Sequence, residues 1–215
     1  MYLIIKGWKG RLGNNILQLI HSLTYANYYK LNLIIKKHKY FKKEKIILFS
    51  DNIENKFLYD ENNDFTNRNV KITGFKNSDI LFENIINKKF IRKQLLNIFK
   101  IKIKKDQYYN DKTLIIYIRS GDIFNERIHP KYISAPYYYY DYILQKYKEK
   151  YNNYILVAEN LDNPVIKKIL KKHPYIIWNK NNLKDDLKIV LGSSHIVSCI
   201  GTFISSLSWI ATNMK

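Results

Sequence analysis

Short apolar runs alternate with amphipathic stretches at the start of the chain. Residues 2–5 form a continuous apolar run, which is typical of a buried parallel strand. From about residue 14 to residue 29, apolar side chains recur every three or four positions, and this spacing predicts an amphipathic helix. Residues 31–36 predict a second strand. The opening of the chain therefore predicts a βαβ unit.

The same alternation returns more clearly in the second half of the chain. Helices are expected from Ser134, as a cap with Pro136 in the first turn, to about residue 147, and from Asp162 onward. Two more are expected at 183–191, ending at Gly192, and at 205–213. Strands alternating with helices indicate a parallel sheet with right-handed crossovers. The predicted strands are 114–118, 154–158, 175–178 and 195–198.

The middle of the chain has weaker patterns. Residues 51–69 are rich in Asn and Asp and predict a loop, whereas 70–73 predict a strand and 85–99 a helix. Residues 100–112 are mostly lysines and polar residues, which is typical of a linker. We therefore predict an α/β protein with two small domains, residues 1–105 and residues 106–215.

The amino-acid composition indicates the cell compartment and excludes some classes of protein. The chain has 215 residues and one cysteine, Cys199, so an internal disulfide and a four-cysteine zinc site are excluded. A reducing compartment fits this cysteine usage. No stretch approaches the roughly 20 apolar residues of a membrane span, and the short apolar start does not resemble a signal peptide. These features predict a protein of the cytoplasm or of the cytoplasmic face of a membrane.

The formal charge of +19 leaves three interpretations open. The first is a solvated, lysine-rich surface, since the lysines are spread along the chain and Asn, Ile and Tyr are abundant as well. The second is a basic groove that captures a nucleotide diphosphate, and the third is polynucleotide binding. Spread-out lysines favour the first over the other two.

A glycine-rich turn, residues 7–15, separates the first strand from the first helix. Glycines allow the backbone to approach a ligand closely, and the helix N-terminus behind them offers N–H groups and partial positive charge. A phosphate site and a plain βα turn both fit this pattern. The spacing Gly-x-x-Gly-x-x-Gly, followed by Lys36 and Lys37 where an acidic residue would be needed, does not fit a nicotinamide dinucleotide fold. The Gly-Lys-Ser/Thr of a P-loop is lacking too.

Two further turns carry candidate chemistry. The strand at 114–118 delivers Arg119 and Asp122 at its carboxyl end, where ligands bind in open α/β sheets. A guanidinium can hold a phosphate with two parallel bonds, although an internal Arg119–Asp122 ion pair would also explain the pattern. Near the end of the chain, Ser205 and Ser206 could cap the last helix and meet an anion there, or serve as caps alone.

In this order the motifs resemble those of the alpha-1,2-fucosyltransferases, glycosyltransferase family 11. Gly10 to Asn15 with Leu17 and Gln18 resembles the family's Gly-Arg-Leu-Gly-Asn-Gln opening, and residues 117–122 resemble its His-x-Arg-Arg-Gly-Asp motif. Residues 133–138 resemble its paired-tyrosine helix, and residues 155–160 are similar to its strand ending in Ser-Asp-Asp. Residues 186–191, 195–198 and 205–209 resemble its closing segment.

The resemblance implies a GT-B fold, with two Rossmann-like halves facing a cleft, the first on the acceptor side and the second on the donor side. It implies a transferase that moves fucose from GDP-fucose to a glycan hydroxyl with inversion and without a metal or other cofactor. Arg119 would bind the β-phosphate and stabilise the leaving GDP, and Asp122 or Glu126 would act as the base. The implied donor-binding residues are Arg11, Gly13, Asn14, Tyr117, Arg119, Glu159, Asn160, Ser205 and Ser206.

The sequence departs from the family motif at two positions. Tyr117 stands in place of its histidine, and Ser120 in place of its second arginine. One cation fewer weakens the neutralisation of a diphosphate, so a glycosyltransferase with another nucleotide-sugar donor is the first alternative. A basic nucleic-acid-binding protein is the second. The expected partners are a nucleotide sugar and a glycan, without nucleic acid, and the positive charge is compatible with peripheral association with a membrane.

Overall fold

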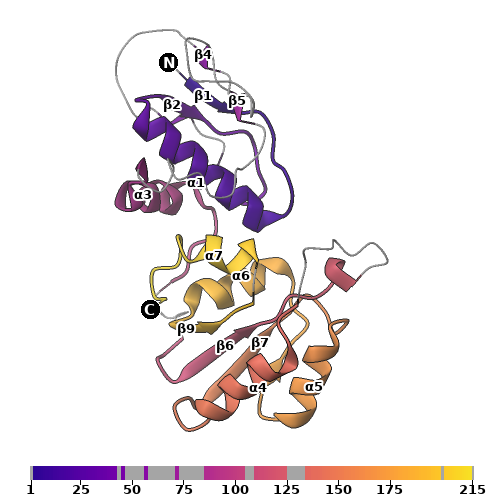
Figure 1. The fold of residues 1–215 in the computed structure, drawn as a ribbon. Coiled ribbons are helices and arrows are strands. Elements are labelled where there is room, and N and C mark those ends of the chain that lie inside the picture. Colours follow the sequence, from indigo (N-terminus) through magenta and orange to yellow (C-terminus); the bar gives the residue numbers. More distant parts are fainter. Residues whose placement is uncertain are drawn as a thin grey trace. The chain divides into compact units, whose positions relative to one another are not determined.

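The structure is a computed structural model that describes residues 2–42, 45–46, 56–57, 71–72, 85–104, 109–124, 134–199 and 201–214. The chain divides into two compact units. The first comprises Met1–Lys100 together with Ser205–Ile210, and the second Ile101–Ile204 together with Ala211–Lys215. Figure 1 traces both units in sequence colours.

The sheet of the first unit is built around β1 (Tyr2–Ile5). This strand pairs in parallel with β2 (Asn32–Ile34), β4 (Lys56–Phe57) and β5 (Lys71–Ile72). The short β3 (Lys45–Ile46) pairs with β2 in the antiparallel direction, which the alternation of elements did not predict. The expected strand at 70–73 is confirmed in β5.

Two helices accompany this sheet. The helix α1 (Leu12–Tyr28) buries the apolar stripe that its spacing predicted, from Ile16 through Leu19 to Leu23, against the sheet. The shorter α3 (Lys88–Ile98) packs against α1 and begins at Asn87, whose side chain accepts a hydrogen bond from the Phe90 N–H. Both predicted helices are confirmed, with ends that differ by a few residues.

The second unit contains a four-stranded parallel sheet in the order β8-β7-β6-β9. Helices join the strands in the predicted alternation, and Figure 1 shows α4 and α5 together beside β6 and β7. The elements are β6 (Thr113–Tyr117), α4 (Tyr137–Lys146), β7 (Asn153–Val157), α5 (Pro164–Lys172), β8 (Ile177–Trp178), α6 (Leu183–Gly192) and β9 (His195–Val197).

The core of the second unit follows the two-residue period of its strands. Leu114 and Ile116 of β6 and Leu156 of β7 point to one face, where they pack against Tyr140 of α4 and Ile166 of α5. Intervening strand residues point to the opposite face. Four successive residues of β6 are buried and most of β7 is buried too, as expected of a parallel sheet that is covered on both faces.

Two predicted helix starts are wrong. Pro136, and not Ser134, is the N-cap of α4, and Asn163, and not Asp162, caps α5 by accepting from the Val165 N–H. Pro164 occupies the first turn of α5, where its fixed φ and missing N–H suit the helix start, so the residue before it takes the cap position.

The last helix differs most from its prediction. It is α7 (Thr202–Leu207), which begins three residues before the expected start at Ser205. Ser205 and Ser206 lie inside the helix, so neither caps it. Ser206 is fully buried and Ser205 is exposed.

Candidate active site

The order in which the chain adds strands to the sheet of the second unit reverses at β6. From β6 the chain passes to β7 and then β8 on one side, and it returns to place β9 on the other side of β6. Ligands of open α/β sheets bind outside the carboxyl ends of the strands at such a switch point. The residues that follow β6 and β9 are therefore the candidate ligand-binding residues.

Arg119 and Gly201 meet at this switch point. They follow β6 and β9, and a Cβ atom built on Gly201 would lie 4.0 Å from an Arg119 guanidinium nitrogen. The φ angle of Gly201 is 150°, a conformation that side chains rarely adopt. The Arg119 guanidinium thus lies near the Gly201 backbone, which carries no side chain. Both are at the edge of the sheet where a ligand is expected.

Asp122 holds the guanidinium. Arg119 Nη2 donates to both Asp122 carboxylate oxygens at 3.3 Å. The Arg119 side chain is 17% exposed and that of Asp122 is 43% exposed. The ion pair that the sequence offered as an alternative therefore exists. Its separation is longer than the roughly 2.7–2.9 Å of an optimal charge-assisted bond, so another anion can compete for the same nitrogen.

A buried network fixes the loop behind Arg119. Ser120 is 1% exposed and donates to Asn160 Oδ1 at 2.5 Å, while its Oγ accepts from the Asn163 N–H at 3.1 Å. The Asn163 side-chain amide donates to the Arg119 carbonyl at 2.9 Å and to Ser134 Oγ at 3.2 Å. Ser134 therefore serves this network. Buried polar groups that are fully paired in this way hold one loop conformation.

Asn163 was missed by the sequence analysis. The signal that could have revealed it is the Asn163–Pro164 pair at the start of an apolar helical pattern, which is a common helix opening. Its side chain caps α5 through the oxygen and holds the Arg119 loop through the nitrogen. It is thus a positioning residue that connects α5 to the candidate site.

The Glu159 carboxylate lies beside this loop, and its charge also acts on Asp186. Gly121 has φ +75°, and a Cβ atom on it would be only 2.6 Å from Glu159 Oε2, so the loop backbone passes close to the Glu159 carboxylate. Burial raises the pKa of Asp186 to about 6 and outweighs a hydrogen bond from Asn181, which lowers this pKa. The charges of Asp185 and Glu159 raise it further. A proton can therefore reside on Asp186 near neutral pH.

Tyr117 ends β6 and faces the start of α7. Its ring lies 5.3 Å from that of Phe203, centroid to centroid, in a tilted arrangement. An aromatic contact of this kind is worth about 0.5–1.5 kcal/mol beyond its buried area. The tyrosine in place of the motif histidine thus contributes packing at the switch point.

The glycine-rich turn of the first unit is braced from within α1. Gln18 is fully buried, and its amide donates to the Gly7 carbonyl at 2.8 Å, while Asn15 Nδ2 donates to the Lys9 carbonyl at 2.8 Å. His38 Nε2 lies 3.2 Å from Asn15 Oδ1, and burial followed by the nearby charge of Lys100 lowers its pKa. The turn is thereby held in a single conformation before any ligand arrives.

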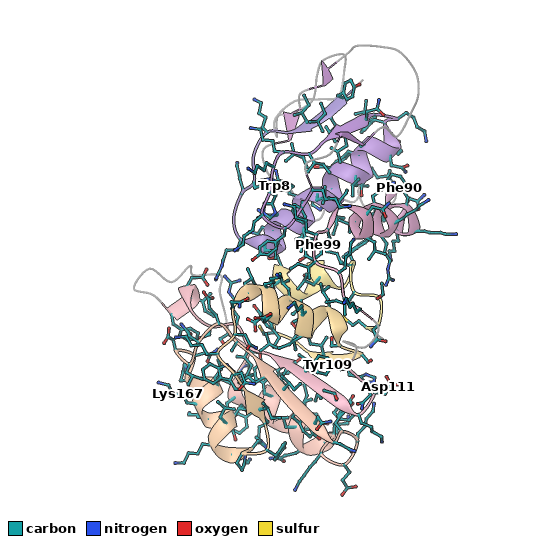
Figure 2. The ribbon with its side chains drawn as sticks, turned by 180° about the vertical axis from the view of Figure 1, so that it is seen from behind. Trp8, Phe90, Phe99, Tyr109, Asp111 and Lys167 are labelled. Carbon is teal, nitrogen blue, oxygen red and sulfur yellow. The ribbon has the colours of Figure 1, made fainter. Side chains whose placement is uncertain are left out.

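The predicted donor-binding residues of the first unit gather at the same turn. Arg11 is the exposed N-cap residue of α1, and Gly13 and Asn14 form its first turn. Gly10 has φ +72°, and a Cβ atom there would collide with the Asn14 side chain. Figure 2 labels Trp8, whose ring lies 4.9 Å from that of His38 at this turn.

Neither a protein-family profile nor a curated protein matches the sequence. Among solved structures, the chain superposes on the crystal structure of NodZ alpha-1,6-fucosyltransferase soaked with GDP-fucose. The TM-score is 0.54, and the match covers 98% of this chain and 92% of that one at 9% identity. The chain has a GT-B fold. The expected fold class is thereby confirmed, whereas alpha-1,2 specificity is not part of this likeness.

Within this GT-B fold, the structure brings together part of the predicted site. Arg119, Asp122 and Tyr117 lie at the carboxyl end of β6, with Glu159 and Asn160 at the carboxyl end of the neighbouring β7. Glu126 lies outside the described residues. Arg11, Gly13 and Asn14 lie in the first unit, to which Ser205 and Ser206 also belong by their contacts. The convergence of the three turns on one ligand stays a prediction.

Metal binding and a membrane span can be compared with the ranges that the structure describes. Within these ranges, no three His, Cys, Asp or Glu side chains gather as they would around a metal ion. None of the helices described combines the length and apolarity that crossing a bilayer requires. Independence from metal and location at a membrane surface stay predictions.

Proposed function

We propose that this protein is a glycosyltransferase that uses a nucleotide sugar, with GDP-fucose as the favoured donor. The observation that carries the proposal is the Arg119 guanidinium beside Gly201 at the switch point of the second sheet. The fold supports it, because the matching solved structure is described as a fucosyltransferase soaked with GDP-fucose.

Arg119 is the proposed diphosphate-binding residue. Phosphate oxygens would replace or share the Asp122 carboxylate at Nη2, and each charge-assisted bond would contribute roughly 1.5–3 kcal/mol. The guanidinium would also stabilise the negative charge that develops on the departing nucleoside diphosphate. Because Asn163 and Ser120 fix the loop backbone, this position is set before the ligand binds.

The remaining roles are part of the same proposal. Asp122 or Glu126 would accept the proton of the acceptor hydroxyl, and Glu159 with Asn160 would contact the nucleoside. Gly13 and Asn14 would contribute N–H groups from the first turn of α1. The reaction would invert the sugar carbon without a metal, and the linkage would be alpha-1,2, as in the family that the sequence resembles.

Calorimetric titration with GDP and with UDP tests the donor. GDP should bind, and Arg119→Ala should weaken it by about tenfold or more, since at least one charge-assisted bond is lost. Arg92→Ala, which removes an exposed arginine of α3, is the matched control and should bind GDP like the parent. Equal GDP affinity of the Arg119→Ala variant and the parent would refute the site assignment. Binding of UDP without GDP would refute the fucose donor.

Transfer from radiolabelled GDP-fucose to a panel of oligosaccharides tests the reaction itself. The product linkage is read by NMR, which separates alpha-1,2 from alpha-1,6 transfer. Hydrolysis of GDP-fucose without transfer to any acceptor would contradict the transferase.

A further inference from the structure

A second concave surface in the second unit lies apart from the Arg119 loop. It is a groove of about 390 Å³ between α4 with its following turn and the edge strand β9. Tyr142, Lys146, Tyr147 and Lys150 line one side, and His195 to Ser198 line the other. Its volume falls in the lower part of the ~300–1,000 Å³ range of ligand sites.

The helical period divides the tyrosine run of α4 between core and groove. Tyr140 is 1% exposed and belongs to the core under the sheet, whereas Tyr142 is 63% exposed. Tyr139, Tyr142 and Lys146 follow one another at spacings of three and four residues and therefore share the face turned to the groove. Tyr140 therefore packs in the core, whereas the Tyr142 side chain is open to solvent.

Lysines and tyrosines on this face are already arranged in pairs. Lys146 Nζ lies 5.6 Å from the Tyr142 ring centre and 5.5 Å from that of Tyr147, and Lys150 Nζ lies 5.3 Å from that of Tyr151. Cation–π contacts of this kind hold an ammonium group over a ring. The groove therefore presents ring surfaces and two ammonium groups in a partly fixed arrangement.

The ends of the groove are also defined. Near the carboxyl end of β9, the Tyr139 hydroxyl donates to the Ser198 carbonyl at 3.0 Å. Near the start of β9, the His195 ring lies 5.5 Å from that of Tyr151, and the Asp111 carboxylate lies 3.9 Å from His195 Nε2. No Asp or Glu is among the described residues that line the groove itself. Its charge therefore favours an anionic occupant.

We propose that this groove binds a short segment of an anionic oligosaccharide. Tyrosine rings offer apolar faces to the C–H surfaces of sugar rings and hydroxyl groups to their edges, and the lysines pair with carboxylate, sulfate or phosphate groups. The concave shape suits a chain of a few sugars better than a flat lipid surface. Two lysines supply fewer phosphate contacts than a polynucleotide needs for tight binding. The proposal rests on the proposed function, because an enzyme that glycosylates a charged glycan needs a second surface that binds its acceptor.

The probe is a heparin-derived tetrasaccharide, with maltotetraose as the uncharged counterpart, titrated calorimetrically at physiological salt. A protein with a charge of +19 attracts any polyanion, so the decisive comparison is between variants of equal charge. Lys146→Ala is compared with Lys167→Ala, an exposed lysine of α5 that Figure 2 shows on the opposite side of the second unit from Asp111. Tyr142→Ala changes no charge at all.

We expect Lys146→Ala and Tyr142→Ala each to weaken tetrasaccharide binding by about tenfold, and Lys167→Ala by less than about twofold. Circular dichroism should show an unchanged fold, since all three side chains are exposed. Maltotetraose should bind at least about tenfold more weakly than the charged probe.

Equal losses in Lys146→Ala and Lys167→Ala, or an unchanged affinity in Tyr142→Ala, would overturn the proposal. So would stronger, groove-dependent binding of a 12-nucleotide oligothymidine or of phosphatidylglycerol vesicles. GDP titrations of the same variants keep the two proposals apart. If the parent does not bind GDP, the donor assignment alone is refuted. If tetrasaccharide affinity does not depend on Lys146 and Tyr142, only the oligosaccharide site is refuted.

Discussion

Asp141 offers a quantitative test of the packing between α4 and α5. Its side chain is almost fully buried and accepts hydrogen bonds from Lys172 at 2.8 Å, from Gln145 at 2.9 Å and from His173, with 2.8 Å between the two heavy atoms. Burial by itself would raise its pKa. The bonds from Lys172 and His173, with the charge of Lys172, outweigh burial and lower the pKa to about 2 from an ordinary 3.8.

The sign of the effect on stability follows from this pKa. The folded carboxylate releases its proton more readily than the unfolded one, so its stabilisation is fully present above pH 3.8 and is lost as the pH falls toward 2. A difference between 3.8 and about 2 corresponds to roughly 2 kcal/mol, at about 1.36 kcal/mol for each factor of ten in proton affinity. Removing the charge should therefore cost about that much at neutral pH.

The perturbation is Asp141→Asn, which keeps the shape and removes the charge. Unfolding of the second unit is followed in urea by the fluorescence of Trp178, in a background that carries Trp8→Phe and Trp209→Phe. The free energy of unfolding is measured from pH 5 to pH 2, a window below the usual titration range of histidine. We expect the parent to be more stable than the variant at pH 5 and this advantage to shrink by roughly 2 kcal/mol by pH 2.

Lys171→Ala, at an exposed lysine on the same helix, is the control and should leave the pH dependence unchanged. A difference between the parent and Asp141→Asn that stays constant from pH 5 to pH 2 would refute the reasoning. In that case the carboxylate would have no perturbed proton affinity in the folded protein.

Three further predictions concern the Arg119 loop and α1. Asn163→Ala should lower the stability of the second unit by about 1–2 kcal/mol, because α5 loses its cap, and thermal unfolding that matches the parent would contradict this role. Gly121→Ala should cost about 1–2 kcal/mol through its positive φ and the nearby Glu159 carboxylate, with a smaller cost in a Glu159→Ala background by urea titration. Burial lowers the pKa of His21 to about 4, so its folded form binds fewer protons and stability should fall between pH 6.5 and 4; an NMR midpoint for the ring above pH 6 would disprove this.

The sequence was sufficient for the elements whose signals are local. The helix expected at 183–191 is found as Leu183–Gly192, and the strand expected at 195–198 is found as His195–Val197. Their apolar spacing and flanking residues lie within one window of the chain. The caps were harder, because several Ser, Asp and Asn residues stand close together near each helix start and tertiary bonds decide between them. Ser134, for example, bonds to Asn163 across 29 positions.

The candidate site could be predicted only in pieces. The Arg119 turn was found from its residues, yet its proximity to Gly201 depends on the strand order, which places β9 beside β6 although α4, α5 and α6 lie between them in the chain. The pKa of Asp186 likewise depends on burial and on Glu159, a distant residue in the sequence. Distances of this kind follow from the folded chain and not from spacing along it.

The inward position of Ser120 limits how this motif could be rebuilt. A guanidinium placed there would replace a hydroxyl that is 1% exposed and bonded to Asn160 and Asn163 on two sides. Engineering Ser120→Arg would disrupt the framework of the loop before it supplied a second cation to a diphosphate. Asn160 and Asn163 should therefore be exchanged together with Ser120 when an arginine pair is built into this loop.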